Sequence, residues 1–293
     1  DKPDLRNPLI IEDISDIMDK SNFAPFKDTV VRCIKVENIE KSNSWYKSME
    51  EYVKGIHGNL GYIQVKEGME LKSSLTKFMS DEVKNELIEK MNLHENDALF
   101  IVADKNRCAR IMGNLRTKLG QELDLIDKNR YEFCIINDFP MFEYDDEETG
   151  AIEFSHNPFS MPKGGLDALN NKNPFEIEAF QYDFVCNGYE MASGGVRNHS
   201  PEILKKAFEL VGYGEDIVRS KFPSLYEAFK YGAPPHAGMA PGIDRIIMLL
   251  KDEENIREIV PFPIGANGAD AMMGCPSEAF PEQLKEAHIK LDI

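Results

Sequence analysis

The chain has 293 residues, of which 42% are hydrophobic and 10% aromatic, and these proportions exclude a protein that is disordered throughout. Its 34 basic and 51 acidic side chains give a formal net charge of −17, which disfavours a protein that coats nucleic acid non-specifically but leaves room for a local basic groove. The sequence contains no apolar run of the roughly 20 residues that span a bilayer, and its five cysteines form no C-x-x-C pair, so we expect a cytoplasmic protein without disulfides or a thiolate zinc site.

The first part of the chain alternates between strand and helix patterns. Residues 1–28 predict a short strand at 9–11 and a helix around 13–20. Between residues 29 and 121, β-branched runs predict strands at 30–36, 60–65 and 98–103, and apolar periodicity predicts helices at 44–57, after Ser80 and at 106–119. Ser80 is the expected N-cap of its helix. The pattern predicts a self-contained αβ block.

The second part carries longer strands that are not joined by crossover helices. Strands are predicted at 133–136, at 152–154 and as one long strand at 182–190, with an acidic turn at 144–150. Ser200 and Pro201 predict a helix start, and residues 242–251 predict a helix with an apolar face formed by Ile243, Ile246, Ile247 and Leu250. This pattern favours an α+β fold in which helices flank an antiparallel sheet.

The long strand carries two carboxylates and is followed by an arginine. Asp183 and Glu190 are seven residues apart, so a regular strand would point them to opposite faces unless Asn187-Gly188 introduces a bulge or bend. One or two carboxylates beside substrate phosphates suit Mg²⁺. From the spacing alone, an ordinary acidic edge strand is the favoured alternative.

Two glycine-rich segments offer possible ligand contacts. In Ser193–Arg197, paired glycines permit close backbone approach and Arg197 offers a planar fork for a carboxylate or phosphate, although a turn with a solvated arginine has the same pattern. Residues 231–245 are dense in glycine and proline and lead into a helix, whose first N–H groups attract anions. Arg245 in its first turn is suited to stack on a base or hold a phosphate, and a merely capped helix is the alternative.

Other catalytic patterns are weak or missing. His156 precedes a proline turn and by itself is typical of a loop residue, and His199 and His236 are equally ambiguous. The sequence has no H-E-x-x-H, Walker or Rossmann motif and no clear nucleophile–histidine arrangement.

Taken together, these motifs resemble the C-terminal part of a bacterial-type aspartyl-tRNA synthetase of class II. The segments that carry the resemblance are DKPDLR at 1–6, DFPMFE at 138–143, SHNPF at 155–159, NGYE at 187–190, YGAPPH at 231–236 and GIDR, similar to the third class II motif, at 242–245. Residues 29–121 are similar to the GAD insertion domain. The resemblance implies a class II catalytic domain at 1–28 and 122–293, with an antiparallel sheet flanked by helices and an inserted αβ GAD-like domain.

The resemblance implies a two-step ligase reaction. Aspartate would attack the α-phosphate of ATP to give aspartyl-adenylate, and the aspartyl group would pass to the acceptor end of tRNA(Asp). By matching positions, Arg197 would hold the side-chain carboxylate of L-aspartate, His156 would contact the amino acid, and Asp183 would lie near its ammonium group. The enzyme would act in the cytoplasm as a homodimer, without a membrane partner.

The same resemblance assigns residues to ATP and Mg²⁺. Asp183 and Glu190 would bind the metal, and the ATP-binding set would comprise Glu190, Gly242, Ile243, Asp244 and Arg245. Arg245 would contact the γ-phosphate side, and with Arg197, Glu190 and Asp183 it would complete the catalytic group. Positioning and electrostatic stabilisation supply most of the catalysis in such a reaction.

The sequence also departs from the family pattern. It carries neither the first two class II motifs nor an anticodon-binding barrel, so we expect a fragment with negligible aminoacylation on its own. Ala240-Pro241 replaces a glycine-richer run and Asn157 stands where relatives often have histidine, and both changes are expected to be tolerated. The alternatives are a non-catalytic binding module and a paralogue that makes asparagine, the latter disfavoured by the GAD-like insertion. Whether tRNA(Asn) is also charged is expected to depend on the missing anticodon domain.

Overall fold

The computed structural model describes residues 2–146 and 150–292. Contacts between residues group the chain into two units, which we call the N-terminal unit (Asp4–Glu132) and the C-terminal unit (Asp1–Pro3 with Phe133–Ile293). Within the described ranges, every helix is too short or too polar to cross a lipid bilayer.

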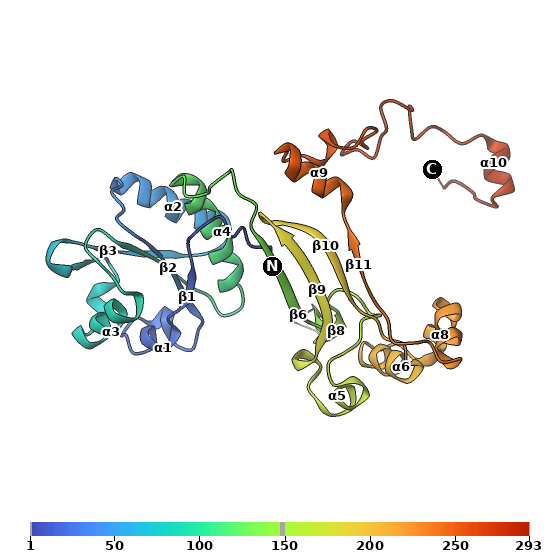
Figure 1. Ribbon diagram of the computed structural model, residues 1–293, viewed down its shortest axis with the longest axis horizontal. Coiled ribbons are helices and arrows are strands. Elements are labelled where there is room, and N and C mark those ends of the chain that lie inside the picture. Colours follow the sequence, from blue (N-terminus) through green and yellow to red (C-terminus); the bar gives the residue numbers. More distant parts are fainter. Residues whose placement is uncertain (1, 147–149, 293) are drawn as a thin grey trace. The chain divides into compact units, whose positions relative to one another are not determined.

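The N-terminal unit is built on a five-stranded antiparallel sheet in the order β1-β2-β5-β3-β4. Its strands are β1 Ile11–Asp13, β2 Val31–Val36, β3 Leu60–Val65, β4 Leu71–Lys72 and β5 Ala98–Ala103. Its helices are α1 Ser15–Met18, α2 Asn43–Gly55, α3 Asp81–Met91 and α4 Cys108–Glu122, with short 3-10 turns η1 Ala24–Phe26, η2 Glu67–Met69 and η3 Thr76–Phe78. Helices α2 and α4 cover one face of the sheet, and α1 and α3 cover the other (Figure 1).

Strand alternation divides the core of this unit between the two faces. Cys33, Ile63 and Ile101 point toward α1 and α3, whereas Ile34 and Phe100 point toward α2 and α4. The predicted strands at 60–65 and 98–103 are confirmed, and Ser80 is confirmed as an N-cap because its side chain accepts a hydrogen bond from the N–H of Val83. The sheet is buried on both faces, which explains its continuous apolar runs.

The N-terminal unit is longer than the predicted 29–121 segment. Strand β1 pairs with β2, with Ile11 opposite Ile34, and the Arg116 guanidinium of α4 donates hydrogen bonds to the carbonyls of Asp4, Asn7 and Leu9. Residues 4–28, which the sequence assigned to the catalytic domain, therefore pack with this unit. The strand predicted at 9–11 lies two residues later, at Ile11–Asp13.

The C-terminal unit contains a four-stranded antiparallel sheet in the order β11-β10-β9-β6 and a separate β7–β8 hairpin. The strands are β6 Phe133–Pro140, β7 Phe142–Asp146, β8 Ala151–Phe154, β9 Glu178–Cys186, β10 Tyr189–Val196 and β11 Ala237–Pro241. The helices are α5 Gly165–Asn171, α6 Pro201–Leu210, α7 Glu215–Lys221, α8 Pro223–Lys230, α9 Ile243–Lys251 and α10 Pro281–Glu286, with 3-10 turns η4 Pro174–Glu176 and η5 Ile256–Glu258. The acidic turn predicted at 144–150 lies partly outside the described residues.

Helix α6 joins the two apolar cores of this unit. Ala207 packs with the cluster around Phe142, and Leu204 and Phe208 pack with the cluster of α7 and α8. The predicted start is confirmed, since the Ser200 hydroxyl accepts a hydrogen bond from the N–H of Ile203. These cores hold α5 to α8 together beside the sheet (Figure 1).

Two predicted features of this unit differ in the structure. The single strand expected at 182–190 is a hairpin of β9 and β10, because Asn187 and Gly188 have φ values of 50° and 86° and form a two-residue reversal. The predicted helix α9 forms, but its expected apolar face is exposed, with Ile243 61% and Leu250 67% accessible.

Candidate active site

A cavity of about 710 Å³ lies against one face of the four-stranded sheet in the C-terminal unit. Four of the site residues that the resemblance assigned line it: His156, Asp183, Glu190 and Arg197. Its wall is completed by Lys2, by residues of β9 and β10, and by the segment from His236 to Ala240. These four side chains lie up to 41 positions apart along the chain, from His156 to Arg197, and the structure brings them into one cavity.

The hairpin and a bulge bring these side chains to one face. Glu190 lies opposite Val185, which shares a strand face with Asp183, so the reversal places the two carboxylates side by side. The register then shifts between Glu190 and Ala192, so that Ser193 pairs with Asp183. This extra residue changes the alternation and turns Arg197 to the same face as Glu190.

The two carboxylates have unlike electrostatic surroundings. Burial raises the pKa of Asp183, the negative charge of Glu190 raises it further, and the positive charge of Lys2 opposes this rise most strongly. Burial also acts to raise the pKa of Glu190, but the hydrogen bond and charge of Lys2 and the charge of Arg245 outweigh burial and leave that pKa lowered. Lys2 Nζ lies 3.1 Å and Arg245 Nη1 lies 3.4 Å from Glu190 Oε2. Asp183 is therefore the carboxylate that a further cation would relieve most.

Arg197 is held by its backbone and by an aromatic ring. Its N–H donates to the carbonyl of His236 at 2.9 Å, and its guanidinium lies 5.4 Å from the centre of the Phe159 ring. No ion pair fixes this guanidinium among the described residues. Across the cavity, the His156 ring lies 4.8 Å from the Phe139 ring, and its Nδ1 is 2.9 Å from the Ser155 hydroxyl.

Positions 194 and 195 require glycine, because neighbouring backbone atoms occupy the space that a side chain would need. A Cβ at Gly195 would lie 2.6 Å from the carbonyl oxygen of Phe180, and one at Gly194 would collide with the carbonyl of Gly238 on β11. Only glycine lets β9, β10 and β11 approach this closely. The turn with a solvated arginine, the alternative reading of this segment, is not what the structure shows, because Gly194 and Gly195 lie within β10.

Of the GIDR segment, only Arg245 reaches the other site residues. Its Nη1 donates to the carbonyl of Glu190 at 2.9 Å as well as approaching the carboxylate. The N–H of Gly242 donates to Met191 at 2.8 Å, and Ile243 and Asp244 are exposed. All four residues of this segment, Arg245 included, lie outside the cavity lining, and Arg245 connects the helix start to the site through its contacts with Glu190.

Several lining residues were missed in the sequence. Gln181 lies two positions before Asp183 and so shares its face, and Ser193 is paired with Asp183 across the hairpin. Strand alternation alone signals Gln181, whereas Ser193 requires knowledge of the bulge. The position of Lys2 in the site was not predictable from its own segment, because it depends on an ion pair with Glu190, which lies 188 positions away.

Comparison with known proteins decides the family. The profile described as "tRNA synthetases class II (D, K and N)" matches residues 1–266. The chain belongs to this family. The resemblance read from the sequence motifs is therefore confirmed, and the α+β architecture of helices and antiparallel sheets agrees with it.

Similar proteins with curated names are bacterial. The chain is 49% identical over 299 residues to an aspartate–tRNA(Asp/Asn) ligase of Erythrobacter litoralis, which covers 99% of this chain and 49% of that protein. It is 46% identical to the enzyme of the same name from Anaplasma phagocytophilum, over 100% of this chain and 50% of the relative. The chain thus spans about half the length of the curated relatives it matches. Among solved structures, an aspartyl-tRNA synthetase of Entamoeba histolytica has a TM-score of 0.35 at 20% identity, covering 80% of this chain and 43% of that one.

Proposed function

We propose that this chain supplies the aspartate- and ATP-binding side of an aspartate–tRNA ligase. One observation carries the proposal: His156, Asp183, Glu190 and Arg197 line one cavity, in a chain whose relatives bear that enzyme's name. In the proposed reaction, an aspartate carboxylate oxygen attacks the α-phosphorus of ATP and pyrophosphate leaves. The adenylate then transfers its aspartyl group to a hydroxyl of the terminal adenosine of tRNA, releasing AMP.

The amino acid is proposed to bind between Arg197 and Asp183. The guanidinium of Arg197 presents paired N–H donors that match the side-chain carboxylate of L-aspartate. Asp183, which is only 9% exposed, provides a counter-charge for the ammonium group of the substrate. His156 on the opposite wall contributes a further polar contact. A positive and a negative side chain that line one cavity fit a ligand that itself carries both charges.

ATP is proposed to bind at the Glu190 and Arg245 end. Arg245 would contact the γ-phosphate side, and Gly242, Ile243 and Asp244 would border the nucleotide. The Asp183–Glu190 pair fits Mg²⁺, because the raised pKa of Asp183 marks a carboxylate short of positive charge, and Mg²⁺ takes one or two carboxylates beside phosphates. When bound, Mg²⁺ would offset negative charge on the phosphates.

The remaining partners are proposed from the family. The acceptor end of tRNA(Asp) would receive the aspartyl group, and the names of the relatives extend their substrates to tRNA(Asn). We place the enzyme in the cytoplasm as a homodimer, and we assign the N-terminal unit, centred on residues 29–121, to the GAD insertion.

Calorimetric titration with L-aspartate and L-asparagine tests the proposal. We expect L-aspartate to bind at least about tenfold more tightly, because the neutral amide cannot form the charge-assisted pair with Arg197. The variant Arg197→Gln should lose this preference, while Arg219→Gln, the same change on exposed helix α7, should keep it. Equal affinity for the two amino acids, or no aspartate binding at all, would contradict the proposal and favour a non-catalytic module.

A further inference from the structure

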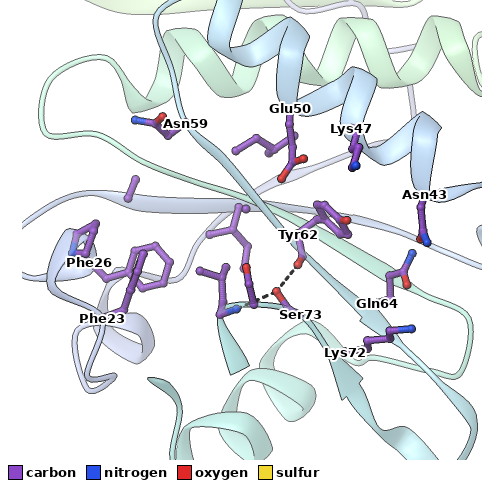
Figure 2. Close-up of a pocket in the computed structure, with 17 residues that line it drawn as sticks. Phe23, Phe26, Asn43, Lys47, Glu50, Asn59, Tyr62, Gln64, Lys72 and Ser73 are labelled. Carbon is purple, nitrogen blue, oxygen red and sulfur yellow. Dashed lines mark hydrogen bonds between the residues drawn. The ribbon is translucent and has the colours of Figure 1, made fainter. Parts of the chain in front are cut away.

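The N-terminal unit contains a groove of about 810 Å³ that no step of the proposed reaction uses. It runs along β3, with α2 on one side and the segment that follows β4 on the other (Figure 2). The turn that contains Phe23, Pro25 and Phe26 lines it as well. Because all of these residues belong to the N-terminal unit, the groove is a feature of that unit alone.

Strand β3 presents an open edge to this groove. It pairs with β5 from Leu60 to Gln64, but with β4 only at Gln64 and Val65. The N–H of Val65 donates to the carbonyl of Asp97 at 2.8 Å, on the β5 side, so the odd-numbered residues of β3 face β5. The peptide groups of Leu60 and Tyr62 therefore point away from β5, toward the groove.

The strand pairing between β4 and β3 covers only Gln64 and Val65, and the chain after β4 contacts the rest of this edge through side chains. The Ser73 hydroxyl donates to the carbonyl of Tyr62 at 2.5 Å and accepts from the N–H of Leu75 at 3.1 Å (Figure 2). Within the described ranges, the N–H groups of Leu60 and Tyr62 have no hydrogen-bond partner. An open strand edge of this kind is a template for an added strand.

The two ends of the groove differ in chemistry. Phe23 and Phe26, whose ring centres are 4.8 Å apart, form an apolar end. Figure 2 shows Lys47 and Lys72 together with Gln64 toward the other end. Neither lysine takes part in an ion pair among the residues that the structure describes. The groove thus offers two uncompensated positive charges at one end and an aromatic surface at the other.

We propose that this groove binds an extended peptide, which adds to β3 as a strand. An apolar side chain of the peptide packs against Phe23 and Phe26, and acidic side chains pair with Lys47 and Lys72. The lined part of β3, Leu60 to Gln64, matches a peptide of about five or six residues at roughly 3.3 Å per residue. This site goes beyond the ligase reaction and does not depend on it.

The observations favour a peptide over single-stranded RNA. Base stacking needs an aromatic ring with an open face, but Tyr62 is stacked on Tyr46 at 4.7 Å and Phe23 packs against both Phe26 and Phe78. Backbone N–H groups aligned along a strand match the carbonyls of another strand. Glu50 on α2 lies between the two ends and disfavours a continuous chain of phosphates.

Fluorescence anisotropy with the full chain tests the proposal. The probe is a labelled, amidated hexapeptide with one phenylalanine near one end, two aspartates at the other and valine and threonine between them, and the reversed sequence covers the other strand direction. We expect one of the two to bind saturably below about 1 mM. Failure of both to bind, or binding of labelled oligouridine in their place, would overturn the proposal.

Backbone methylation of the probe distinguishes an added strand from simple charge attraction. Two versions of the binding peptide carry N-methyl groups on alternate amides, one set even and one set odd. Since an added strand turns only alternate N–H groups toward β3, one version should lose binding and the other should retain it. Equal binding by both versions would overturn strand addition.

Charge variants of the chain provide the matching protein-side test. The double variant Lys47→Glu, Lys72→Glu should lower the affinity for the peptide by about tenfold. Both side chains are exposed, and each substitution replaces a charge that attracts the acidic peptide with one that repels it. Lys54→Glu, on the same helix but outside the groove lining, should bind as the original chain does. Unchanged affinity of the double variant would overturn the assigned acidic contacts.

Discussion

At the scale of single residues, Asp183 and Glu190 show how neighbouring charges in one hairpin shift the pKa values of two carboxylates in opposite directions. Glu190 is neutralised by Lys2 and Arg245, while Asp183 remains buried beside a like charge. A group whose pKa is raised on folding binds more protons in the folded state, so its contribution to stability falls as the pH rises through that window. At neutral pH the ionised Asp183 therefore destabilises the unit that contains it.

The variant Asp183→Asn tests whether the ionised Asp183 destabilises the fold at neutral pH. We expect a higher melting temperature at pH 7, by about 2 °C, because the amide keeps the shape of the side chain and removes the buried charge. The difference should shrink toward about pH 4, near the ordinary pKa of an aspartate. Differential scanning calorimetry at both pH values measures it, and a lower melting temperature of the variant at pH 7 would contradict the electrostatic account.

Individual site residues were predictable where their chemistry is visible in the sequence. Asp183, Glu190 and Arg197 combine residue types suited to a metal and to a carboxylate, and the motifs added His156. The common face of the two carboxylates depends on the reversal at Asn187-Gly188, where the sequence had indicated a possible bulge or bend. The position of Arg197 on that face was not predictable, because the register shift between Glu190 and Ala192 has no marker in the sequence. Lys2 was unpredictable for a different reason, namely its long-range contact with Glu190.

At the scale of elements, the hairpin of β9 and β10 is the feature on which the site depends. Apolar and polar residues alternate on both sides of Asn187-Gly188, so the segment was predicted as one strand with a bulge or bend at that dipeptide. The reversal is visible only in the dipeptide itself, since Asn-Gly suits a turn with two positive φ values. The strands β3 and β5 gave no such ambiguity, because each is a short, mainly apolar run that a charged residue follows, Lys66 after β3 and Asp104 after β5.

The variant Gly188→Ala tests the role of the turn. At a φ of 86° an alanine is strained, so we expect the free energy of unfolding of the C-terminal unit to fall by about 1–2 kcal/mol. Gly113→Ala is the matched control, since Gly113 lies in α4 and a Cβ added there would meet open space. For this variant we expect the free energy of unfolding to rise by about 0.5–1 kcal/mol. Urea denaturation measures both, and an unchanged Gly188→Ala variant would show that the turn does not constrain the hairpin.

At the scale of the whole molecule, the chain consists of two units with separate cores. The clusters on the two faces of the N-terminal sheet contain only residues between Leu9 and Leu125, and the cores of the other unit begin at Met141. A domain with its own apolar core is able to fold alone. The predicted boundary at residue 29 missed β1, because a three-residue edge strand carries little periodicity.

Expression of residues 4–132 alone tests this independence. We expect a cooperative thermal transition and a dispersed NMR spectrum, because no buried cluster is cut. The segment 29–121 serves as the control and should be less stable, since it lacks β1, α1 and two fully buried core residues, Ile14 between them and Met18 in α1. A non-cooperative melt of residues 4–132 would contradict the division into units.

The central claim is that Arg197 and Arg245 serve one pocket, at its amino-acid end and its nucleotide end. The most direct measurement is calorimetric titration of the full chain with a non-hydrolysable aspartyl-adenylate analogue, which spans both ends. We predict saturable binding that weakens by about tenfold or more in each of Arg197→Gln and Arg245→Gln. Absence of binding to the original chain, or full affinity in either variant, would contradict the claim.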